Sequence, residues 1–400
     1  EPKLSDCAEK QNSRDRLSPR FDSPMRIVHV IQSASQIYGA ERCVLDETVA
    51  LTRRGHHVEV LLCHETRLGD DQDRLERELR ALGIATTRVE ATSQLNPQLV
   101  AAWYSTLKRL RPDVVHSHSI KTDVLSVAVC RFLGLPLVVE VHGYLRPDDL
   151  RIRLYEQLDR LSLRLAAAVL TLSSDYRSEV IASGVASSKT HLLPSGIDTS
   201  HLRAQVGQRD LRRELCREGE VVVGMVARLS PEKGHAQFLT AMAGLKRLGL
   251  PVRGVLYGEG PLAEELQARI DAEQLNVTLA GYVREIADAY RSLDVLTSCS
   301  HNEGLPLNLM EAMALGVPVV AMATGGCREI VQHEVTGVLV PAGNLSAFTA
   351  ALASLVQDRE RRLAFARAAV EVAETRFSLD AWVHGAEAVY EAVCQRTGRG

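Results

Sequence analysis

Two carboxylates lie eight residues apart, at Glu303 and Glu311, in the stretch "EGLPLNLMEAMALG". Eight steps of about 100° leave two side chains on an ideal helix roughly 80° apart, so these acids do not form a pair on one helix face. Pro306 is favoured at the first position of a helix, and Gly316 suits the end of one. The pattern predicts a helix between them, with Glu303 in the preceding loop and Glu311 inside the helix.

The start of this helix predicts an anion site. The backbone amides near Gly304 and Leu305 would have no partner within the helix, and they would lie at the positive end of its dipole. Carboxylates in direct contact with a phosphate would repel it, so we expect Glu303 and Glu311 to accept hydrogen bonds from hydroxyl groups on either side of the anion. A ligand that carries hydroxyls, phosphate and hydroxyls in series is a sugar nucleotide.

A basic loop could complete the anion site. In "ARLSPEKG", Arg228 and Lys233 follow a buried strand pattern and precede a helix pattern. A solvated basic loop is one interpretation, and a clamp for the charge that grows on a departing diphosphate is the other. No Asp-x-Asp motif of the kind that holds a metal-bound diphosphate stands out. We therefore expect no metal, and no cofactor beyond a nucleotide-sugar co-substrate.

Composition limits the classes of protein that remain. The 400 residues are 46% hydrophobic with a mean hydropathy of -0.05 and a net charge of -3, which is typical of a soluble two-domain protein with no preference for nucleic acid. The eight cysteines are widely spaced in mostly apolar runs, as in reduced cytosolic proteins. No apolar run of about 18 residues and no signal-peptide pattern occurs. We expect a cytoplasmic protein.

Strand-like apolar runs alternate with amphipathic helical runs from Met25 onward, which predicts an α/β protein. The alternation restarts after a polar stretch at 200–220, so we expect two doubly wound, Rossmann-like sheets whose carboxyl ends face each other across a cleft. The predicted parts are a disordered extension (1–24), an acceptor-side domain (25–198), a sugar-nucleotide domain (199–377) and a terminal helix that packs back on the first domain (378–400).

A dinucleotide-binding domain is the obvious alternative for such sheets. The candidate fingerprint "YGEGPL" has Gly258 and Gly260 after a strand pattern, but it lacks the third glycine and has Pro261 at the helix start instead. A bare Gly-x-Gly is weak evidence for this class, so the sequence disfavours NAD chemistry.

Four motifs together resemble a known family. "SGID", "ARLSPEKG", "YGEGP" and "EGLPLNLMEAMALGVPVVA" are similar to those of the retaining, sugar-nucleotide-dependent glycosyltransferases with the two-domain GT-B fold, family four. The resemblance covers nearly all of residues 25–377. It implies that Glu303 contacts hydroxyls of the transferred sugar and that Glu311 binds the nucleotide ribose.

The resemblance also assigns the remaining donor-binding positions. It implies that Arg228 and Lys233 bind the diphosphate, and that the backbone around Gly304, Leu305 and Pro306 contributes donors to the sugar and phosphates. Val283, in the loop after Gly281, matches the segment that meets the base. These assignments agree with the reasoning from residue types and spacing.

The first domain carries fewer standard motifs. "SASQIYGAERCV" resembles the glycine-rich loop whose backbone approaches the diphosphate, with Tyr38-Gly39 where many relatives have two glycines. His142 matches the family histidine near the reacting sugar, and a core or capping histidine is the alternative. His116 and His118 fall on one side of a strand. No cysteine or carboxylate partner completes a metal site for them, so we expect acceptor contact or a structural role, not zinc.

The resemblance implies transfer of a sugar, with retention at the anomeric carbon, to a glycan, lipid-linked or small-molecule acceptor. No residue is an evident nucleophile, so attack by an acceptor hydroxyl on the face of the leaving diphosphate is favoured over a covalent intermediate. A sugar-nucleotide epimerase of the same fold and a catalytically inactive sugar-nucleotide-binding subunit stay open as alternatives. A purely structural protein would leave the motifs unexplained.

An arginine-rich helical segment, "YLRPDDLRIRLYEQLDRLSLRLAAA", suggests where the protein works. We expect its apolar stripe to pack on the sheet. The alternative is peripheral association with an anionic membrane at the inner face of the plasma membrane, where the arginines would meet lipid headgroups. The arginines are Arg146, Arg151, Arg153, Arg160 and Arg164, and the stripe is Leu150, Leu154, Leu158, Leu161 and Leu165.

Overall fold

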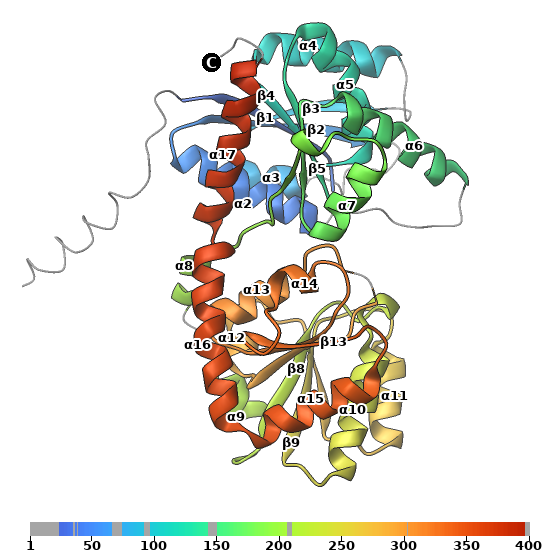
Figure 1. Cartoon of the computed structure of the whole chain (residues 1–400), viewed down its shortest axis with the longest axis vertical. Helices are drawn as coiled ribbons and strands as arrows, with labels where there is room; N and C mark the ends of the chain where they lie inside the picture. The colour runs from blue at the N-terminus through green and yellow to red at the C-terminus, as the bar shows by residue number, and fades with distance from the viewer. Residues whose placement is uncertain are drawn as a thin grey trace, which may run out of the picture.

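The computed structural model describes residues 24–34, 37, 39–65, 74–91, 97–142, 150–205, 210–301 and 303–396. Two parallel β-sheets, each covered by helices, form two domains (Figure 1). The expected α/β fold with two doubly wound, Rossmann-like domains is confirmed. The expected disordered extension lies outside the described residues except for Pro24, and Tyr38 lies outside them as well.

The first domain is built on a seven-stranded parallel sheet in the order β3-β2-β1-β4-β5-β6-β7. Helices cover both faces of its centre, which explains why the middle strands are continuous apolar runs. The strands are β1 (Arg26–Gln32), β2 (His57–Glu65), β3 (Ala85–Ala91), β4 (Val114–Ser117), β5 (Leu137–Val141), β6 (Ala168–Thr171) and β7 (Thr190–Leu192). The helices are α2 (Gly39–Arg53), α3 (Arg74–Ala81), α4 (Pro97–Leu110), α5 (Ile120–Leu133), α6 (Leu150–Leu165) and α7 (Ser174–Ala182).

The second domain is built on a six-stranded parallel sheet in the order β10-β9-β8-β11-β12-β13. Its strands are β8 (Val221–Val226), β9 (Val252–Tyr257), β10 (Val277–Gly281), β11 (Val295–Ser298), β12 (Val319–Met322) and β13 (Gly337–Val340). Its helices are α8 (Thr199–Ala204), α9 (Leu211–Leu215), α10 (His235–Arg247), α11 (Ala263–Ala272), α12 (Ile286–Arg291), α13 (Leu307–Ala314), α14 (Cys327–Ile330), α15 (Leu345–Gln357) and α16 (Arg359–Arg376).

Each sheet has one switch point, where the order of strands reverses: between β1 and β4 in the first domain, and between β8 and β11 in the second. Doubly wound sheets bind ligands beyond the carboxyl ends of the strands at this point. Gly39 follows β1, His118 follows β4, Lys233 follows β8 and Glu303 follows β11. The two switch points therefore carry the loops that the motifs single out.

The last helix, α17 (Leu379–Arg396), returns to the first domain and runs along α2 (Figure 1). The chain crosses between domains where Ile197 and Ser378 form a β-bridge. From there, Val383 and Tyr390 are buried in a cluster with β1 residues such as Ile27. The terminal helix thus ties the far end of the chain to the core of the first domain.

Glu387 anchors α17, and its removal should destabilise the fold. Its fully buried carboxylate accepts hydrogen bonds from Arg54 Nε at 2.7 Å and from His56 Nε2 at 2.9 Å. Because truncation leaves a largely buried guanidinium without its partner, Glu387→Ala should lower the free energy of unfolding by about 3 kcal/mol. Urea unfolding measures this. Glu371→Ala, at an exposed position on α16, is the control and should stay within about 0.5 kcal/mol of wild type; an equally small effect of Glu387→Ala would contradict the anchoring role.

The outer face of α6 carries leucines, contrary to expectation. Leu158, Leu161 and Leu165 are 37%, 51% and 46% exposed, whereas Asp159 and Leu163 are buried. The expectation that these leucines pack on the sheet is therefore wrong, because α6 packs against α5 through the intervening positions. The side chains of Leu150, Arg151, Arg153 and Leu154, and all of Arg146, lie outside the described residues.

Candidate active site

An ion pair joins the two motif loops at the switch point of the second domain. Lys233 ends a short 3₁₀ turn after β8, and its Nζ donates to Glu303 Oε1 at 2.7 Å. The hydroxyl of Ser300 donates to the same oxygen at 2.6 Å. Lys233 thus offsets the negative charge of Glu303, which would otherwise repel a nearby phosphate. The sequence singled out both residues but not their pairing.

Glycines hold these loops close together. A Cβ on Gly234 would come within 2.2 Å of the Cys299 carbonyl oxygen, and a Cβ on Gly325 within 1.9 Å of the Glu303 carbonyl oxygen. Gly325 also has a positive φ of 44°, which favours glycine. The amide of Gly326 then donates to the Glu303 carbonyl at 3.2 Å. Glycine at these positions therefore allows the close approach of the loops around Glu303.

The helix predicted from Pro306 begins one residue later. Pro306 is the N-cap of α13, which starts at Leu307, and Gly316 follows its end with a φ of 74°. Gly304 and Leu305 precede the cap and are half-buried. Their backbone therefore lies at the amino end of α13, where an anion would be stabilised by the helix dipole.

Glu311 sits inside α13 and faces the first domain. Its Oε2 accepts a hydrogen bond from the Tyr290 hydroxyl at 2.5 Å. Burial raises the pKa of the Glu311 carboxyl, while the Tyr290 hydrogen bond and the charge of Arg42 act in the opposite direction. Arg42 belongs to α2, so this interaction crosses between domains. Neither Tyr290 nor Arg42 could be predicted as a partner of Glu311, because neither lies in a motif that points to it.

His142 follows β5 and meets the Glu303 loop. A Cβ built on Gly304 would lie 3.1 Å from the His142 carbonyl oxygen and 3.5 Å from the Tyr176 hydroxyl, so the two domains touch here. Burial lowers the pKa of the half-buried His142 imidazole, Glu140 raises it, and His118 lowers it further. A neutral imidazole can both donate and accept a hydrogen bond.

Three other predicted donor-site residues occupy the same edges of the two sheets. Gly39 begins α2, and a Cβ there would meet nothing within 4 Å, so the space beside its backbone is open. Arg228 follows β8 and is exposed. Val283 follows β10 and is half-buried against the core of the second domain. The structure thus places these residues at the carboxyl ends of strands, as a shared ligand would require.

His116 and His118 do not face a space that an acceptor could reach. They are 0% and 3% exposed, and the Tyr390 hydroxyl lies 2.7 Å from His116 Nδ1. This burial favours the structural role, the other half of the expectation, for His116. The expectation that no carboxylate partner is present is wrong, because Glu47 lies 3.7 Å from His116 and Glu140 lies 3.3 Å from His118.

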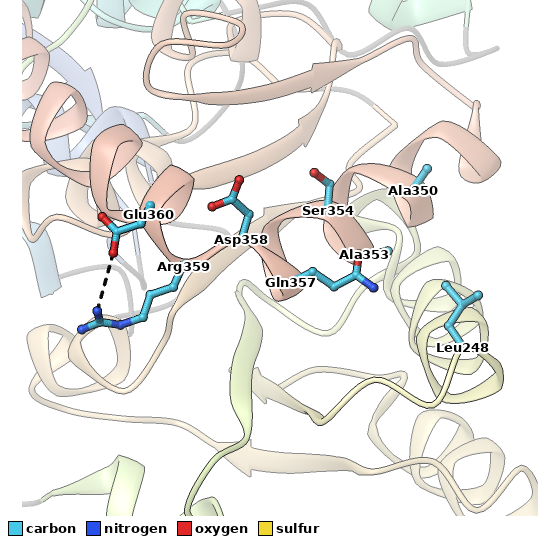
Figure 2. A pocket seen from close by; sticks show the side chains of 8 residues that line it. All are labelled: Leu248, Ala350, Ala353, Ser354, Gln357, Asp358, Arg359 and Glu360. Atoms are coloured by element: carbon cyan, nitrogen blue, oxygen red, sulfur yellow. Dashed lines mark ion pairs between the residues drawn. The ribbon is translucent and has the colours of Figure 1, made fainter.

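A separate surface cavity of about 790 Å³ lies at the junction of α15 and α16, and Figure 2 shows the side chains that line it. Its charged lining comes from Asp358, Arg359 and Glu360, all exposed to solvent. Asp358 is the N-cap of α16 and accepts a hydrogen bond from the Arg361 amide at 2.9 Å. The lining includes none of the residues predicted to bind the donor, so the cavity has no part in the proposed chemistry.

Both domains match models of glycosyltransferase families. Residues 37–201 match the family described as Glycosyltransferase Family 4, and residues 208–372 match glycosyl transferases group 1. Together the two matches show that the chain is a glycosyltransferase of the family-four type. An Escherichia coli UDP-Gal:alpha-D-GlcNAc-diphosphoundecaprenol alpha-1,3-galactosyltransferase is 26% identical over 84% of this chain and 89% of its own length. A D-inositol 3-phosphate glycosyltransferase of Segniliparus rotundus is 32% identical over 70% of this chain and 66% of its own length.

Solved structures share the architecture. Anabaena Alr3699/HepE in complex with UDP matches with a TM-score of 0.80, covering 92% of this chain and 100% of that chain at 23% identity. A Rickettsia africae glycosyltransferase matches with a TM-score of 0.78 over 93% and 99%, at 17% identity. These structures show that the fold is GT-B, and the family matches show that the chain is a glycosyltransferase. Among the helices of its described residues, none is long and apolar enough to cross a bilayer.

Proposed function

We propose that this chain transfers a sugar, with retention at the anomeric carbon, from a nucleoside-diphosphate sugar to a hydroxyl of a glycan, lipid-linked or small-molecule acceptor. One observation carries the proposal: the Lys233–Glu303 pair, 2.7 Å apart, lies at the switch point of the second sheet, and the adjoining Gly304 touches His142 of the first domain. A cation, a carboxylate that can accept hydrogen bonds from sugar hydroxyls, and backbone amides at the amino end of α13 together suit a sugar diphosphate.

Positively charged groups bind the diphosphate of the donor, and a carboxylate binds its sugar. Arg228, Lys233 and the amides at Gly304 and Leu305 stabilise the charge that develops on the diphosphate as its bond to the sugar carbon breaks. Glu303 accepts hydrogen bonds from hydroxyls of the sugar, and the backbone of Val283 meets the base.

The other contacts position the donor and the acceptor. Glu311 accepts hydrogen bonds from the ribose, and His142 orients the sugar from the first domain. The acceptor oxygen forms the new bond to the anomeric carbon on the face that the diphosphate leaves. The proton of the acceptor hydroxyl passes to the departing diphosphate oxygen, so no protein nucleophile is needed.

Slow hydrolysis of the donor tests retention without knowledge of the acceptor. Proton NMR of the sugar first released from an α-linked nucleotide sugar should show the α-anomer, because water then takes the place of the acceptor hydroxyl. First release of the β-anomer would contradict same-face attack. The same spectra separate the alternatives: an epimerase would convert the donor into its epimer, and an inactive subunit would leave it unchanged.

Diphosphate binding is proposed to need no metal ion, since Lys233 and Arg228 supply the positive charge. Transfer or donor hydrolysis should therefore continue at an unchanged rate when EDTA is present in the assay. Adding magnesium or manganese back should not raise it. Strict dependence on either ion would contradict the proposed clamp.

We also propose that the chain works in the cytoplasm and docks on an anionic membrane surface through the outer face of α6. Leu158, Leu161 and Leu165 are exposed there, and the exposed Arg164 lies among them. Apolar side chains that enter the headgroup region beside basic ones are typical of helices that lie on a membrane. The name of the Escherichia coli relative specifies a diphosphoundecaprenol-linked acceptor, which agrees with a membrane-bound substrate for that protein.

Sedimentation with liposomes checks the docking face. Wild-type protein should pellet with vesicles that contain anionic phosphatidylglycerol, pellet less at high salt, and fail to pellet with neutral vesicles. Leu161→Ser combined with Leu165→Ser should reduce pelleting, because these exposed leucines would enter the bilayer surface. Leu248→Ser is the matched control, since Leu248 is 63% exposed on the second domain. Equal, negligible pelleting under all conditions would contradict the proposal.

A further inference from the structure

A polar cluster is enclosed in the first domain, where a doubly wound fold normally places apolar side chains. His29 lies on β1, Glu47 on α2, His116 on β4 and His118 directly after β4. Each is at most 3% exposed. They lie at the switch point of the sheet, between β1 and β4. The proposed transfer chemistry uses none of the four.

The ligand atoms of this cluster converge on one point. His29 Nδ1 lies 2.9 Å from His118 Nε2 and 3.9 Å from Glu47 Oε2, and His116 Nδ1 lies 3.7 Å from Glu47 Oε1. Tetrahedral coordination with bonds of about 2.0–2.1 Å places neighbouring ligand atoms about 3.3–3.4 Å apart. The observed separations lie on both sides of that value, and one atom from each of the four residues lies within 4.8 Å of all the others.

The cluster and its surroundings carry negative charge that a cation could balance. Glu47 and Glu140 are both buried, and Glu47 Oε2 and both oxygens of Glu140 have no hydrogen-bond partner among the described residues. The ion pairs recorded for these two carboxylates in the described chain involve only histidines. Two buried carboxylates with no lysine or arginine partner are costly unless protons or a cation neutralise them. One divalent ion would balance both charges.

We propose that His29, Glu47, His116 and His118 form a site for one divalent transition-metal ion of the zinc type. Three imidazoles and one carboxylate are ligands that zinc prefers, and four protein ligands leave no open position for water or substrate. The site would therefore be structural, holding β1, α2 and β4 together. It goes beyond sugar transfer and does not depend on it.

Tyr390 contacts two of the proposed ligands, Glu47 and His116. Its hydroxyl donates to Glu47 Oε1 at 2.7 Å, which leaves Oε2 free to bind an ion and couples α17 to the site. The same hydroxyl lies 2.7 Å from His116 Nδ1. A network of hydrogen bonds without any metal is thus the competing state. Because the ligands are enclosed, EDTA added to native protein in an activity assay should not remove such an ion.

Metal content and refolding distinguish the two states without an activity assay. The full chain, produced with zinc in the medium and dialysed against EDTA while folded, should keep about one zinc ion per chain by mass spectrometry. The protein is then unfolded in guanidinium with EDTA and refolded with or without zinc. Refolding without zinc should yield a lower melting temperature, and zinc should restore it. Refolding with cobalt should give the visible absorption of a tetrahedral ion.

The metal content of variants tests whether these side chains bind the ion. Glu47→Gln and His29→Asn should lose the ion after EDTA dialysis, whereas His64→Asn, which changes a buried histidine of β2 outside the cluster, should keep it. If a variant does not fold, the wild-type metal content and refolding decide alone. Wild-type protein that retains no metal after refolding with zinc, and melts at the same temperature with and without it, would overturn the proposal in favour of hydrogen bonds only.

Discussion

Glu303→Ala is expected to abolish sugar transfer while leaving the chain folded. Glu303 makes its contacts with Lys233 and Ser300 in a loop rather than within the apolar core, so truncation removes little packing. What it removes is the acceptor for the sugar hydroxyls, and losing one such positioned contact costs about 100- to 1000-fold in kcat. Steady-state kinetics, with circular dichroism as the check on folding, measure the effect.

Two further variants sharpen this test. Glu303→Gln keeps the size of the side chain but loses its charge, so it should also be strongly impaired. Glu232→Ala changes an exposed acid on the same turn as Lys233 and should retain near-normal turnover. A folded Glu303→Ala protein with near-normal turnover would remove the central residue assignment.

Lys233→Ala and Arg228→Ala are each expected to lower kcat by at least about tenfold, because each removes a positive charge that stabilises the departing diphosphate. Lys233→Ala should be the more severe, since it also leaves Glu303 without its partner at 2.7 Å. Lys246→Ala, at an exposed site on α10, is the control. The clamp would be wrong if both variants changed only the KM for the acceptor.

A double-mutant cycle separates the ion pair from the individual residues. Lys233 and Glu303 are in direct contact, so their effects should not add: the double variant should be less impaired than the product of the two single losses. Additive effects would indicate that the contact is not maintained during turnover.

The fold was predictable because the central strands of parallel sheets are apolar along their whole length. Two of the apolar runs that predicted the alternation of strands and helices are β1 (Arg26–Gln32) and β5 (Leu137–Val141). The side of an amphipathic helix that faces inward was not predictable. The α6 leucines have the spacing of a buried face, yet they are exposed. The buried face of α6, which packs on α5, carries Asp159 and Leu163 instead.

The candidate site was predictable as separate motifs, and its pairings were not. Lys233 and Glu303 follow β8 and β11, which are three apart in chain order but adjacent in the second sheet, so only the strand order brings the two residues together. The enclosed histidine cluster was missed for the same reason. Glu47 lies on a helix and Glu140 on another strand, and neither belongs to a motif that contains His116 or His118.

The central claim is tested most directly by measuring the thermal stability of the chain in the presence of a panel of nucleotide sugars. Thermal unfolding would be followed with UDP-, GDP- and ADP-sugars for the wild type and for Glu311→Ala. A donor present at 100 times its dissociation constant should add roughly 2.7 kcal/mol to the free energy of unfolding of the wild type, and much less to that of Glu311→Ala. Failure of every nucleotide sugar to stabilise the wild type at millimolar concentration would contradict a sugar-nucleotide site between the two domains.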